Sequence, residues 1–143
     1  MDKITEKHLA KLEERLINGD RIPIEKSSEW AKSFPEHGGV CLVRENGEIC
    51  YCGETGNFRT RANDLITTGK HTLRKSIGIE KFSQLPDFVK PESKKFSPNL
   101  EKELNGILEA NFEITVVPID EGRGELKKRI IKKYTPFYNN YAR

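Results

Sequence analysis

The chain has 143 residues and a mass of 16.4 kDa, which is most simply one domain with a modest core. Charged residues make up 33% of it, yet its net charge is only +3, so a nucleic-acid partner is permitted but not required. No apolar run approaches the length of a transmembrane helix, and we expect no membrane partner.

The N-terminal part predicts a helix followed by a leader segment. Residues 2–18 have a helical pattern of apolar positions that ends at Gly19. Residues 20–37 contain Pro23 and Pro35 and are expected to form a loop. Within it, Trp30 either anchors the leader on the core or stacks on a base, and the first interpretation is favoured. We therefore divide the chain into residues 1–37, packed on the domain, and the domain itself, residues 38–143.

A β-hairpin and a helix are predicted next. Residues 40–44 and 48–51 alternate as strands around Asn46-Gly47, a strong signal for a tight turn. A helix is expected from about Asn57 to Thr68, with Asn57 as its N-cap and Gly69 after its end.

The second half of the chain predicts further helices and one strand. A short helix is expected over residues 71–78, and residues 80–97, polar and interrupted by prolines, are expected to form a long excursion outside the core. Ser97-Pro98 begins another helix, residues 112–117 form the third strand, and residues 125–133 form the last helix.

Three cysteines, Cys41, Cys50 and Cys52, fall within the predicted hairpin. Their odd number and the absence of a signal-like segment favour a reducing cytoplasm. The Cys-x-Cys spacing does not match the usual Cys-x-x-Cys zinc pair, so buried thiols are favoured over a zinc site. Alternation along a strand places Cys50 and Cys52 on one face.

Three motifs occur in a fixed order: Gly39-Val40-Cys41, Tyr51-Cys52-Gly53 with the following Thr55–Arg61 segment, and Ile130–Asn139. Together they resemble the motifs of the GIY-YIG nuclease superfamily over about residues 38–140. The resemblance implies an α/β (α+β) fold with a small three-stranded antiparallel sheet flanked by helices. It also implies hydrolysis of phosphodiester bonds with one divalent ion, Mg²⁺ or Mn²⁺.

The resemblance carries several roles to this chain. Tyr51 and Arg61 match the tyrosine of the second triplet and the arginine that steadies phosphate charge. Cys41 stands where the first triplet has tyrosine, and a thiol is a poor substitute for a phenol in positioning water. His71 either supplies the missing base or is a surface residue at the start of a helix. The supporting residues implied by the motifs are Gly39, Gly53, Thr55, Asn57 and Asn139.

The metal position is the most serious departure from the motif. The glutamate that holds the ion in this superfamily corresponds to residue 127, which is lysine here. Glu125 lies about 200° from that position around a helix, and Glu121 precedes the helix. These two glutamates are the candidate replacements, Glu125 only if the helix begins differently.

Two functions from different classes follow from these residues. The first is a metal-dependent DNA endonuclease with a relocated carboxylate. The second is a nucleic-acid-binding module that kept the fold and lost the metal site; a protein-interaction domain is a third possibility. DNA is the expected partner, RNA stays open, and a homodimer or larger complex would supply specificity. The candidate nucleic-acid-binding residues are Arg59, Lys70, Arg74 and Lys75, although such clusters are usually solvated helix faces.

Overall fold

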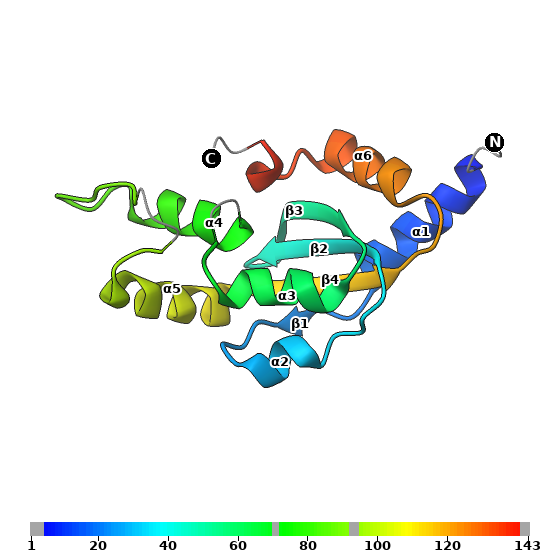
Figure 1. Ribbon diagram of the computed structural model, residues 1–143. Helices are drawn as coiled ribbons and strands as arrows, with labels where there is room; N and C mark the ends of the chain where they lie inside the picture. Colours follow the sequence, from blue (N-terminus) through cyan, green and yellow to red (C-terminus); the bar gives the residue numbers. More distant parts are fainter. Residues whose placement is uncertain (1–4, 70–71, 92–94, 141–143) are drawn as a thin grey trace.

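The central element of the computed structural model is a four-stranded antiparallel sheet with the order β1-β4-β2-β3 (Figure 1). The structure describes residues 5–69, 72–91 and 95–140. The strands are β1 (Ile22–Pro23), β2 (Gly39–Glu45), β3 (Glu48–Thr55) and β4 (Phe112–Pro118). The predicted antiparallel sheet flanked by helices is confirmed, but the expected number of three strands is wrong. The extra strand, β1, adds to β4 from the segment that was expected to be a loop.

Helices cover both faces of this sheet (Figure 1). The helices are α1 (Glu6–Asn18), α2 (Ser28–Lys32), α3 (Phe58–Ile66), α4 (Leu73–Phe82), α5 (Pro98–Asn111), α6 (Arg123–Tyr134) and the 3₁₀ helix η1 (Phe137–Asn139). The Asn57 side chain accepts hydrogen bonds from the first backbone N–H groups of α3, and Ser97 caps α5 in the same way, as predicted. Within the described residues, no helix is long and apolar enough to cross a bilayer.

The sheet separates two hydrophobic cores. The larger core lies between one face of the sheet and α2, α3, α4 and α5, and it includes Trp30, which packs edge-on against Phe34. The smaller core lies on the other face, where Leu12 and Leu16 of α1 meet α6. The leader thus contributes buried side chains to the larger core, and α1 contributes them to the smaller core on the other face.

A β-bulge changes the faces on which the cysteines lie. Val43 pairs with Tyr51, but the next residue of β2, Arg44, pairs with Ile49, so Cys50 is the extra residue of β3. Cys50 therefore joins the larger core and Cys52 the smaller one, and the expectation that they share a face is wrong. All three thiols are buried and unpaired with one another, as predicted.

The excursion expected over residues 80–97 is shorter than predicted. Helix α4 continues to Phe82, and Phe82 packs against Phe88 and edge-on against Phe96, with ring centroids 6.4 and 5.6 Å apart. Phe82 and Phe96 are buried in the larger core. The prediction missed them because these aromatics are separated by polar residues without helical or strand periodicity.

Ion pairs connect α1 to α6 on the smaller-core face of the sheet. The Glu13 carboxylate, only 9% exposed, is 2.6 Å from Arg129 Nε and 2.5 Å from Lys133 Nζ. Burial alone would raise the pKa of Glu13, but the hydrogen bonds from Lys133 and Arg129 outweigh it, and the pKa is lowered. Two of the basic residues of α6 are thereby committed to the fold.

Because the pKa of Glu13 is lower in the folded chain, its stabilising contribution is complete above the ordinary glutamate pKa. The contribution is lost as the pH falls through the lowered value. Urea unfolding between about pH 7 and pH 3 should show this loss for the wild type. The variant Glu13→Gln should be less stable at neutral pH and should lose less stability on acidification. Equal pH profiles for the two proteins would contradict this role of Glu13.

Candidate functional site

A narrow crevice on the larger-core face of the sheet brings three of the predicted site residues together. Side chains from β2, β3, α3, α4 and β4 line it: Cys41, Val43, Tyr51, Arg61, Asp64, Leu65, Leu73 and Ile114. Its volume is about 10 Å³, close to the minimum that one water molecule needs. A larger ligand would therefore bind across its mouth, where Arg61 and Asp64 are each about one-third exposed.

Gly53 holds the position of the Tyr51 ring. Both residues point to the same side of β3, and a Cβ at Gly53 would lie only 2.8 Å from the phenol oxygen of Tyr51. Cys41 pairs with Gly53 from the neighbouring strand. The glycine of the second motif therefore leaves room for the Tyr51 side chain to lie along the strand.

Arg61 points a donor into this site. Its Nε is buried and has no hydrogen-bond partner among the residues that the structure describes, whereas one terminal nitrogen is 3.5 Å from an Asp64 carboxylate oxygen. Buried donors in folded proteins are nearly always satisfied, so an orphaned guanidinium N–H is unusual. Arg61 thus retains capacity for a further acceptor.

Asp64 is a site residue that the sequence analysis missed. It lies three residues after Arg61 on α3 and therefore on the same side of the helix, which is the signal that could have identified it. Burial raises the pKa of Asp64, and the positive charge of Arg61 opposes part of that rise. The crevice consequently contains one carboxylate beside one guanidinium.

Cys41 is a neutral thiol in this environment. It is 1% exposed, and burial raises its pKa, while the charge of Arg61 lowers it by a smaller amount. A buried neutral thiol is neither a nucleophile nor a base. At the position of the first motif tyrosine, Cys41 therefore acts as an apolar wall of the crevice.

The closing motif supports β3 through Asn139. Its side-chain oxygen accepts from the Cys52 N–H at 2.8 Å, and its side-chain nitrogen donates to the Cys52 carbonyl at 2.8 Å. The amide thus pairs with the outer edge of β3 as a neighbouring strand would. Asn139 thereby ties η1 to the strand that carries Tyr51 and Gly53.

The other motif residues shape the backbone around the crevice. The Thr55 hydroxyl bonds both the N–H and the carbonyl of Asn57 at 3.1 Å, which fixes the turn into α3. At Gly39, a Cβ would lie 2.1 Å from the Val117 carbonyl oxygen, so β2 and β4 can approach only because this residue is glycine.

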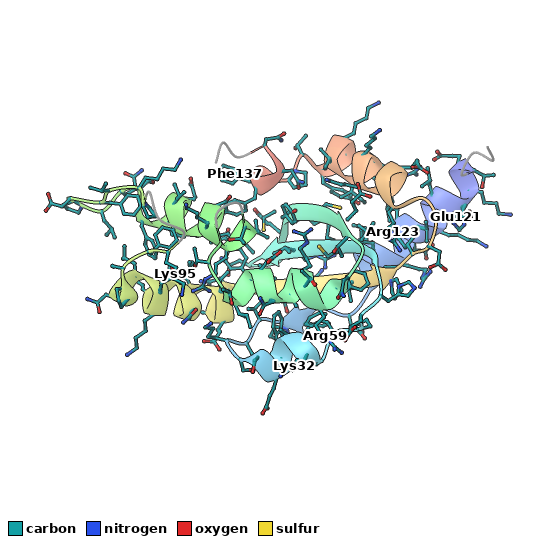
Figure 2. All side chains as sticks on the ribbon, in the orientation of Figure 1. Lys32, Arg59, Lys95, Glu121, Arg123 and Phe137 are labelled. Atoms are coloured by element: carbon teal, nitrogen blue, oxygen red, sulfur yellow. The ribbon has the colours of Figure 1, made fainter. Side chains whose placement is uncertain are left out.

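The two candidate metal glutamates do not lie in the crevice. Glu125 is exposed on α6, and Glu121 lies with His8 and Arg15 of α1 in a separate groove (Figure 2). No group of three His, Cys, Asp or Glu side chains within residues 5–69, 72–91 and 95–140 is placed to hold a metal ion. Lys127, at the motif position of the metal glutamate, is half-buried on α6.

The basic residues expected to bind nucleic acid have different environments. Arg59 bonds the Phe34 carbonyl and the Glu36 carboxylate, and so joins α3 to the segment after α2 (Figure 2). Arg74 is fully buried within a polar network, and Lys75 is also buried. Lys70 and the candidate base His71 lie outside the described residues.

No protein-family model matches the sequence, and a search of curated proteins found no match either. Two solved structures that resemble the chain are point mutants of the GIY-YIG N-terminal endonuclease domain of UvrC from Thermotoga maritima, each bound to its catalytic divalent cation. Each is 19% identical in sequence to this chain, with a TM-score of 0.44. The matched region covers 78% of this chain and 91% of the UvrC domain. These neighbours are GIY-YIG endonuclease domains, the family that the sequence motifs resemble.

Proposed function

We propose that this chain binds the phosphodiester backbone of a nucleic acid at the mouth of the crevice between Tyr51 and Arg61. DNA is the expected nucleic acid. The observation that carries the proposal is the buried Nε of Arg61, which has no partner among the described residues. A guanidinium presents its N–H groups in a fixed fork that matches phosphate oxygens, and charge-assisted bonds of this kind are among the strongest in proteins. A phosphate at the mouth would bond the exposed part of the Arg61 guanidinium, and a small outward turn of the side chain would bring the orphaned Nε–H to the same group.

The nearby carboxylate does not block such a partner. The Arg61–Asp64 pair is long, at 3.5 Å, and both side chains are about one-third exposed. Ion pairs with this degree of exposure contribute little, about 0–1 kcal/mol, so a phosphate competes successfully for the guanidinium. Asp64 instead orients Arg61 while the site is free.

The divalent ion implied by the motif resemblance does not fit the residues of this site. Lys127 takes the place of the coordinating glutamate, and a protonated ammonium repels a cation. Asp64 is the one carboxylate that lines the crevice, and the Arg61 guanidinium beside it carries a positive charge that also repels a cation. The residues of the crevice therefore do not support a metal-dependent hydrolytic step.

One observation favours a second candidate, cleavage of the bound strand. The Asp64 carboxylate and the Tyr51 phenol line the same crevice, and a carboxylate whose pKa is raised by burial is better suited to act as a general base. Plasmid nicking with and without added Mg²⁺ or Mn²⁺, wild type beside Asp64→Asn, tests this candidate. Cutting by the wild type that disappears in the variant would support an endonuclease. If the wild type leaves the plasmid uncut, binding without cleavage is the function that remains.

The proposed binding is tested by fluorescence anisotropy with a labelled DNA duplex and a labelled single-stranded RNA. Two or three phosphate contacts should weaken the affinity by roughly 10- to 40-fold between about 50 and 200 mM salt. If RNA binds more tightly than DNA, RNA becomes the proposed partner and the proposed site stays the same. Absence of binding, or affinity that does not respond to salt, would contradict the proposal.

A further inference from the structure

We propose that a pocket at the turn end of the β2–β3 hairpin binds an arginine side chain presented by a partner protein. The pocket lies between the hairpin, the C-terminal end of α4 and η1, and its volume is about 470 Å³. Pockets that bind small chemical groups commonly have volumes of about 300–1,000 Å³. This pocket shares no lining residue with the crevice that contains Arg61, so the two sites can be occupied independently.

The charged side chains of the pocket favour a cationic ligand. Three glutamates and one lysine line it: Glu45, Glu48, Glu80 and Lys81. The lysine is already paired with Glu45. Among the described residues, no basic group lies within 4.0 Å of the Glu48 or the Glu80 carboxylate. The lining charges are three negative and one positive, a sum of −2, which attracts a cation and repels a phosphate.

An exposed aromatic ring also lines the pocket. Phe137 of η1 is 52% exposed, although it is a large apolar side chain (Figure 2). Its ring is nearly perpendicular to that of Tyr138, at 89°, with the ring centroids 5.0 Å apart, and Tyr138 is buried in the larger core. Tyr138 thereby anchors the exposed ring beside the glutamates. An aromatic face attracts a cation through its partial negative charge, so the ring and the unpaired carboxylates favour the same class of ligand.

Arginine matches both features better than the other cations that proteins present. Its guanidinium is planar, stacks on aromatic rings and donates paired hydrogen bonds to carboxylates, whereas a lysine ammonium is compact and strongly hydrated. Arginine is also enriched among the residues that contribute most to protein–protein binding. Free arginine is a poorer ligand, because Glu48 and Glu80 would repel its own carboxylate, which is a neutral amide within a polypeptide. The pocket therefore favours an arginine on a partner protein.

The experiment uses fluorescence anisotropy with end-capped glycine–serine peptides that carry an uncharged dye. One peptide contains two arginines, the second has two lysines in their place, and the third has two citrullines, which are uncharged and nearly isosteric with arginine. The wild type should bind the lysine peptide about two- to fivefold more weakly than the arginine peptide, the value of a cation–π contact at an exposed site. The citrulline peptide should bind at least about tenfold more weakly.

Variants of the pocket test which side chains bind the peptide. Phe137→Leu keeps an apolar side chain without the ring and should weaken the arginine peptide by about two- to fivefold. A double variant, Glu48→Gln with Glu80→Gln, should weaken it by about tenfold. Glu103→Gln is the matched control, because Glu103 is an exposed glutamate on α5 outside the pocket, and its affinity should stay within about twofold of the wild type.

Three results would contradict the proposal. Equal affinity for the arginine and citrulline peptides, or wild-type affinity in both pocket variants, would overturn the site. An equal loss in Glu103→Gln and in the double variant would also overturn it, since the attraction would then come from the general charge of the surface. Displacement of the labelled peptide by free arginine at a lower concentration than by end-capped arginine would overturn the assignment to a partner protein.

Discussion

Replacing Arg61 by alanine is expected to weaken duplex binding by roughly 10- to 100-fold, the loss of a charge-assisted contact worth about 1.5–3 kcal/mol. Within the described part of the chain, the guanidinium has a buried Nε without a partner and one long contact, to Asp64, so its loss leaves few native hydrogen bonds unmade. The free energy of unfolding should therefore change little. Anisotropy titrations and urea unfolding of the same samples measure the two effects.

The matched control is Arg59→Ala, two residues earlier on the same helix. Arg59 donates a hydrogen bond to the Phe34 carbonyl and forms an ion pair with Glu36, so it belongs to the contact between α3 and the leader. Its replacement should lower stability slightly and leave the affinity for DNA within about twofold of the wild type, as expected for a partly exposed ion pair. A greater loss of binding in Arg59→Ala than in Arg61→Ala would move the interface from the crevice to the leader.

The largest effect on stability is expected for Arg74→Met. The Arg74 side chain is 1% exposed, and it donates to Thr68 Oγ1, the Leu65 carbonyl, the Glu101 carboxylate and Asn105 Oδ1. These bonds connect the end of α3 to α4 and α5. Methionine fills a similar volume but leaves these four acceptors and a fifth, the Glu101 carbonyl, without their donor. Removing one partner of a buried ion pair costs about 3–5 kcal/mol.

Urea unfolding measures this loss, with Lys102→Met as the control at an exposed position of α5. The control should unfold within about 0.5 kcal/mol of the wild type. DNA binding by the folded fraction of Arg74→Met should be unchanged, because Arg74 has no exposed surface for a phosphate. A stable Arg74→Met protein with weakened DNA binding would show instead that Arg74 belongs to the interface, as the sequence suggested.

Local signals in the sequence predicted the elements that depend on neighbouring residues. The Asn46-Gly47 turn, the Asn57 cap and the Ser97-Pro98 helix start each depend on backbone groups within four residues, and all three are confirmed. Strand β1 was missed because two residues, one of them Pro23, are too short for any alternation.

Features that depend on residues far apart in the sequence could not be predicted from local patterns. Arg74 lies in a run of basic residues, which favours a solvated or phosphate-binding face, but its partners Glu101 and Asn105 are about thirty residues away. The separation of Cys50 from Cys52 depends on the register between β2 and β3, which alternation alone does not give. At the candidate site, the motif resemblance pointed to Tyr51 and Arg61, which line the same crevice, whereas the orphaned Nε of Arg61 is visible only in three dimensions.

The most direct test of phosphate binding at the crevice is a crystal structure of the chain bound to a short DNA duplex in the absence of divalent ions. We expect one backbone phosphate at the mouth of the crevice, with its oxygens about 2.7–2.9 Å from the nitrogens of the Arg61 guanidinium. A duplex bound to another face, with no phosphate on the Arg61 guanidinium, would contradict the proposal.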